Sequence, residues 1–158
     1  MRLAWFGSAL FASVIFQATL WAYAARRNEP QGELLWPAFL LSIGAIILQS
    51  FWGASRVRPV SAWRPTQAAT RGLTVGLGVG LITAWGASAT AVTIGTLFAL
   101  ISDGLRGASG LLRELPELAL GLVLPAPLTL FPSLVGGAFG GAAVAVLKHR
   151  MLRHGTAA

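Results

Sequence analysis

Four long stretches without a charged side chain constrain this sequence more than any other feature. They cover residues 3–25, 34–55, 73–102 and 118–147. A helix needs about 20 apolar residues to cross a bilayer, and only a helix satisfies all backbone polar groups of a single segment there. Charged residues make up only 11% of the chain, against roughly 25% in soluble domains. The sequence therefore predicts an all-α integral membrane protein with four transmembrane helices in one membrane domain, residues 1–158.

The charges in the connecting segments predict the orientation of these helices. The side that carries both termini and the loop 56–71 has eight basic residues and no acid: Arg2, Arg56, Arg58, Arg64, Arg71, Lys148, Arg150 and Arg153. The opposite side has four basic residues and all five acids. Short cytoplasmic loops are enriched in Lys and Arg, so we expect both termini in the cytoplasm. The excess of Arg, Ala and Gly indicates a GC-rich bacterial genome, so the expected location is a bacterial inner membrane.

Small residues recur at every fourth position in the third and fourth stretches, a pattern called a glycine zipper. The third stretch carries one such stripe, and the fourth carries two, side by side. The residues concerned are Gly72, Gly76, Gly80, Ala84 and Ser88, then Gly136 with Gly140, and Gly137 with Gly141 and Ala145. Such stripes let helix backbones approach closely in lipid. Either the stripes face each other within the chain, or one of them receives a neighbouring subunit, a lipid or a pigment.

The fourth stretch is unsuited to one straight helix because Pro125, Pro127 and Pro132 fall within eight residues. The preceding residues, 103–124, place leucines at three- and four-residue spacing opposite charged side chains. That pattern favours an amphipathic helix at the membrane interface, followed by a proline-bent last helix. A discontinuous membrane helix, of the kind that transporters use for substrate binding, is the alternative.

Hydroxyl groups and a basic loop are the remaining candidates for binding. Thr83, Thr90 and Thr93 lie near one face of the third stretch and could line a solute path, although hydroxyls in membrane helices usually bond to their own helix or to a neighbouring one. The loop 56–71 contains no acid; its candidate residues for lipid headgroups or a partner are Arg56, Arg58, Trp63, Arg64 and Arg71. Beside two membrane segments, anionic lipid explains these residues better than nucleic acid does.

The positions of individual tryptophan, glutamine and histidine residues lead to further predictions. Trp5 and Trp21 bracket the first stretch, and Trp36 and Trp52 bracket the second, so all four are predicted to anchor at headgroup depth. Gln17 and Gln49 are predicted to hydrogen-bond across helices. His149 and His154 stand among basic residues near the C-terminus and are interpreted as a solvated tail.

The four stretches hold no ionisable residue away from their ends, and such residues mark most intramembrane enzymes and ion-coupled pumps. The sequence has no cysteine, no HExxH motif and no phosphate-binding loop. We therefore expect no catalysis, no metal and no required cofactor, with bound lipid or pigment left open. The first hypothesis is a non-catalytic subunit packed among other integral membrane subunits; the alternative is a small homo-oligomeric channel or transporter for a small solute.

Overall fold

The part of the chain that the structure describes folds into four helices. The computed structural model describes residues 1–26, 32–58, 64–123 and 127–155, which form α1 (Arg2–Arg26), α2 (Gly32–Arg56), α3 (Pro65–Val123) and α4 (Pro127–Gly155). No strand occurs within those ranges, so the predicted all-α class is confirmed. Each helix contains a window long and apolar enough to cross a bilayer. The fold is that of a multi-pass helical membrane protein.

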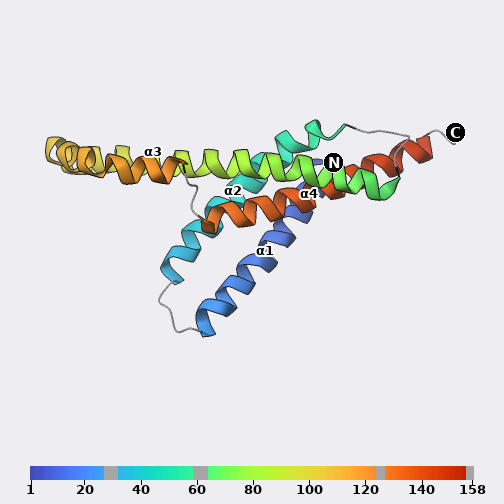
Figure 1. Cartoon of the computed structure of the whole chain (residues 1–158), viewed down its shortest axis with the longest axis horizontal. Helices are drawn as coiled ribbons and strands as arrows, with labels where there is room; N and C mark the ends of the chain where they lie inside the picture. The colour runs from blue at the N-terminus through green and yellow to red at the C-terminus, as the bar shows by residue number, and fades with distance from the viewer. Residues whose placement is uncertain (27–31, 59–63, 124–126, 156–158) are drawn as a thin grey trace.

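Helix α4 is the centre of the arrangement. It contacts α1, α2 and α3, and its contact with α3 is the most extensive in the molecule. Within the described ranges the backbones of α1 and α3 do not come close to each other. Figure 1 shows the consequence: α1 and α2 diverge from the far half of α3, while all four helices converge near the end that carries both termini.

The segment 103–124, predicted to be a separate interfacial helix, is helical as far as Val123 but belongs to α3 in the structure. The reason lies in the sequence: no proline separates it from the third stretch. In Figure 1 its last turns, drawn in orange, run back toward the start of α4. Pro125 lies outside the described residues, whereas Pro132 stands inside α4, which continues past it for more than five turns.

Side chains cap the start of α3 and the end of α2 by hydrogen-bonding to free backbone groups. The backbone N–H of Arg64 donates to Oε1 of Gln67 at 3.1 Å, which is half of a capping box at the start of α3. Lys148 on α4 donates from Nζ to the carbonyl oxygens of Ala54 and Val57, at 2.8 and 2.7 Å. These carbonyls belong to the end of α2, where the backbone lacks partners and a positive charge is favourable.

The core is built mainly from small side chains, whereas many large apolar side chains point outward. Among the described residues, the buried apolar side chains apart from Trp5, Ile46 and Pro132 are alanines and valines. Phe11, Leu40 and Ile94 are among the exposed large ones. In water such a surface would drive aggregation, but in hydrocarbon it is the expected exterior, and interhelical contacts use small residues.

Candidate functional site

The stripe on α3 and one stripe on α4 face each other inside the chain. The helices run antiparallel, and the pairs are Gly72 with Gly141, Gly76 with Gly137, and Gly80 with Ser133. A Cβ on Gly76 would overlap the carbonyl oxygen of Gly137 and would lie 2.5 Å from its carbonyl carbon. Contact this close is possible only without side chains, so these glycines are required by the packing of the monomer.

The second stripe on α4 faces α1 instead. A Cβ on Gly136 would lie 2.9 Å from Oγ of Ser13 and 3.2 Å from the carbonyl oxygen of Ala9. Adjacent positions on a helix point about 100° apart, so Gly136 with Gly140 and Gly137 with Gly141 serve two different neighbours. Of the remaining stripe residues on α3, Ala84 and Ser88 are both buried. The glycine zipper therefore holds α1, α4 and α3 together in that order.

Trp5 fills the space between α1, α2 and α4 and is fully buried. Its ring lies against two glycines: a Cβ on Gly140 would be 2.6 Å from Cδ1, and a Cβ on Gly53 would be 2.8 Å from Cζ2. The prediction of an interfacial anchor is therefore wrong for Trp5. Interfacial spacing alone could not reveal that two glycines on other helices leave a slot for the indole. Trp21, Trp36 and Trp52 remain exposed.

Two polar side chains reach across the bundle to backbone oxygens of α4. Oγ of Ser13 donates to the carbonyl oxygen of Pro132 at 3.1 Å, and Nε2 of Gln49 donates to that of Ser133 at 3.3 Å. A helical side chain covers the turn before its own Cα, so Gly136 and Gly137 leave the carbonyls four residues earlier accessible. The bond across helices predicted for Gln49 is thus present.

Gln17 departs from the same prediction. Its side chain is 4% exposed, yet neither Nε2 nor Oε1 has a hydrogen-bond partner. It lies beside an aromatic cleft of about 400 Å³ between α1 and α2, whose lining also includes Trp21, Trp36 and Phe39. A buried amide without a partner costs roughly 1–3 kcal/mol on the scale of protein mutational data, so this residue needs a separate explanation.

A larger groove of about 810 Å³ separates α2 from α3. Gly44 and Gly86 lie in its walls, and a Cβ on either would meet nothing within 4 Å. Thr83 and Thr90 also line it, whereas Thr93 does not. All three hydroxyls donate to carbonyls of their own helix four residues earlier, at 2.7, 2.8 and 2.8 Å. Their donor capacity is therefore used, and only acceptor capacity remains for a solute.

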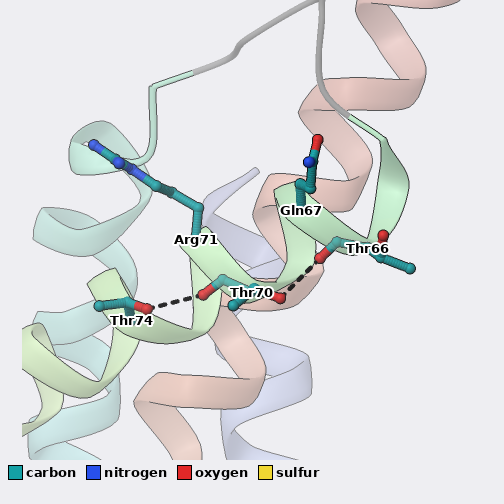
Figure 2. Close-up of a pocket in the computed structure, with 5 residues that line it drawn as sticks. All are labelled: Thr66, Gln67, Thr70, Arg71 and Thr74. Atoms are coloured by element: carbon teal, nitrogen blue, oxygen red, sulfur yellow. Dashed lines mark hydrogen bonds between the residues drawn. The ribbon is translucent and has the colours of Figure 1, made fainter.

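The candidate basic residues of the loop 56–71 that the structure describes lie at the end of the bundle that carries both termini. Arg56, Arg58, Arg64 and Arg71 are exposed, and Trp63 lies outside the described residues. The guanidinium of Arg56 stands 5.0 Å from the ring centre of Trp52. Figure 2 shows a hollow at the start of α3 lined by Thr66, Gln67, Thr70, Arg71 and Thr74.

Within that hollow the threonine hydroxyls bond along the helix. Thr70 donates to the carbonyl of Thr66 at 2.9 Å, and Thr74 donates to that of Thr70 at 3.0 Å. The guanidinium of Arg71 points away from this row (Figure 2). The threonine hydroxyls therefore use their donor capacity within α3.

The interpretation of His149 as part of a solvated tail is wrong. Its imidazole is 2% exposed and neither ring nitrogen has a hydrogen-bond partner, while His154 is exposed as expected. The neighbouring Lys148 turns inward to close the end of α2, so this part of α4 packs on the bundle. The signal available in the sequence was small: Lys148 is the one lysine in an arginine-rich chain.

Within the described ranges no three His, Asp or Glu side chains group as metal ligands. What the structure does bring together is a set of packing surfaces, two hydrogen bonds to the α4 carbonyls of Pro132 and Ser133, and two apolar hollows beside α2. Comparison of the chain with protein-family models, with curated proteins and with solved structures finds no match.

Proposed function

We propose that this chain is a non-catalytic integral subunit of a larger membrane complex, and that its partner packs into the groove between α2 and α3. The observation that carries the proposal is that this groove is uncovered, whereas the glycine stripes are covered by other helices of the same chain. Gly72, Gly76 and Gly137 are already covered by backbone, so they offer nothing to a partner. Gly44 and Gly86 have no neighbour.

The groove has the dimensions and the chemistry of a helix-docking surface. Its volume is about 810 Å³, and small residues in both walls, among them Ala45 and Ala87, permit close approach. Large apolar side chains at its rim, such as Leu48 and Ile94, supply dispersion contacts to an inserted helix. A partner helix bound there would rest on α2 and α3 at once.

For the surroundings we propose a bacterial inner membrane with both termini in the cytoplasm. The described basic residues at the shared end, among them Arg58, Arg64 and Arg150, support this orientation because they are exposed. At that surface each adds about 1 kcal/mol of attraction to anionic lipid. A reporter fused to the C-terminus tests the orientation, and activity of a periplasm-specific reporter there would contradict it.

The experiment that tests the subunit role uses single cysteines, because the natural chain has none. Gly86→Cys places a thiol in the groove, and Gly78→Cys places one on an exposed face with no neighbour within 4 Å. We expect a defined integral membrane protein to co-purify with the natural chain and to cross-link through residue 86 but not through residue 78. Purification as a lone monomer, or equal cross-linking at both positions, would remove the support for a subunit.

The alternative, a small homo-oligomeric channel or transporter, rests on Thr83 and Thr90 in the same groove. Their hydroxyl oxygens could accept bonds from a passing solute after donating to α3 itself. Solute flux into liposomes that disappears in Thr83→Val and Thr90→Val would favour this function over the subunit. Flux unchanged by both substitutions would exclude this path.

A further inference from the structure

We propose that the aromatic cleft between α1 and α2 binds a neutral, lipid-soluble ring compound of the quinone and quinol class, with Gln17 as its hydrogen-bonding group. The cleft holds about 400 Å³ and is lined by Val14, Gln17, Ala18, Trp21, Trp36 and Phe39. None of these side chains carries a charge, and three are aromatic rings. Apolar and aromatic walls with a few placed polar groups are typical of small-molecule sites.

The side chain of Gln17 carries the argument. It is 4% exposed, and neither its amide nitrogen nor its oxygen has a partner. Gln49, the matched glutamine on α2, does donate to a backbone oxygen of α4. A buried polar group without a partner is destabilising in the protein alone. A ligand that hydrogen-bonds to the amide would remove that cost at the moment of binding.

The aromatic rings define what kind of molecule fits beside Gln17. Trp21 and Trp36 meet edge to face with ring centres 5.4 Å apart, and Phe39 lies 6.0 Å from Trp36. Trp21 and Trp36 are 38% and 55% exposed, so part of each ring is free to stack on a flat ligand. A neutral lining of this kind does not favour a charged phospholipid headgroup.

The two polar atoms of the amide select ring substituents. Nε2 donates, and therefore suits a ring carbonyl; Oε1 accepts, and therefore suits a ring hydroxyl. A quinone offers the first and its reduced form the second. Gln17 lies four residues from Trp21 on α1, about 6 Å along the axis, so a ring held there sits one turn below the exposed indole, with space for an apolar tail in the surrounding lipid.

The test is a titration of the full-length protein in nanodiscs with decylubiquinone, with empty nanodiscs as the blank. We expect saturable binding with one site per chain, weakened about tenfold by Gln17→Leu because a single hydrogen bond is lost. Trp36→Ala should also weaken it. Gln49→Leu, which alters a glutamine outside the cleft, should change the affinity less than twofold.

Folding is checked on the same samples. Gln17→Leu removes no hydrogen bond within the protein, so its melting temperature should equal or exceed that of the natural chain, and weaker binding then reports the lost contact. The proposal is overturned by an absence of saturable binding, by equal affinity in Gln17→Leu, or by binding of decane as tight as that of decylubiquinone. The last result would identify a cleft for acyl chains.

Discussion

The crossing of α3 and α4 gives the sharpest test of how this fold is held together, through the substitution Gly76→Ala. The added methyl would lie 2.5 Å from the carbonyl carbon of Gly137 and 3.0 Å from the backbone nitrogen of Ala138. Carbon atoms in contact are about 3.5 Å apart or more, so the two backbones must separate by about 1 Å at this point. Backbone atoms cannot relieve the overlap by changing rotamer, as a flexible side chain can.

Separating α3 from α4 weakens the Cα–H···O and dispersion contacts between them, which lowers the free energy of unfolding. At three successive levels a glycine hydrogen on α3 points at a carbonyl oxygen of α4: Gly141 for Gly72, Gly137 for Gly76, and Ser133 for Gly80. Such Cα–H···O contacts contribute about 0.5–1 kcal/mol each, and a gap of 0.5–1 Å forfeits about a quarter to a half of the dispersion attraction. We therefore expect Gly76→Ala to lower the free energy of unfolding by about 1–3 kcal/mol.

Gly78→Ala is the matched control, because it makes the same chemical change two residues away at an exposed position with nothing within 4 Å. Alanine favours helix over glycine at both positions, so the control should be neutral or slightly stabilising. The assay is unfolding by sodium dodecyl sulfate in mixed micelles, followed by tryptophan fluorescence. Equal stability of the two variants would refute the close crossing of α3 and α4.

Three further predictions concern single buried contacts. Trp5→Ala should lower the free energy of unfolding by about 3–5 kcal/mol because it empties the slot between α1, α2 and α4; a loss below about 1 kcal/mol in chemical unfolding would place Trp5 outside the core. Gln49→Leu should lower the free energy of unfolding by about 0.5–1.5 kcal/mol because a hydrogen bond is lost, whereas Gln17→Leu should not lower it. A Gln17→Leu variant less stable than Gln49→Leu in the same assay would contradict the assignment of hydrogen-bond partners. Lys148→Met should lower the free energy of unfolding by about 1–3 kcal/mol because two carbonyls at the end of α2 lose their donor. Arg150→Met, at an exposed position, should change stability little. Similar melting temperatures for the two variants would disprove the cap.

Much of the fold was predictable because the bilayer restricts the options of the chain so strongly. Charge-free length alone indicates four helices, since hydrocarbon permits no other single-segment structure. The glycine stripes were recognisable for a similar reason, because spacing on a helix fixes which residues share a face. Spacing does not contain the identity of the neighbour, so the choice between contact within the chain and contact with a partner depends on how the helices pack in three dimensions.

The individual side chains were harder to predict, because their surroundings come from helices distant in sequence. Trp5 fits an interfacial pattern, but its slot is formed by Gly53 and Gly140. His149 stands among charges in sequence, yet α4 carries it against the bundle. The same limit applies to Gln17, whose lack of a partner becomes visible only when every neighbouring polar atom has been placed.

The two adjacent stripes on α4 also determine where a partner has room. Because Gly136 and Gly137 point about 100° apart, they hold α1 and α3 on different sides of α4, and the backbones of those two helices do not come close within the described ranges. The groove between α2 and α3 is lined on the α3 side by residues between Ile82 and Ile94. Glycines inside the monomer and glycines in the open groove should then respond oppositely to mutation: Gly76→Leu should impair folding whether or not a partner is present, whereas Gly86→Leu should leave the isolated chain folded and abolish only assembly. If Gly86→Leu assembled as well as the natural chain, the groove would not be the docking surface.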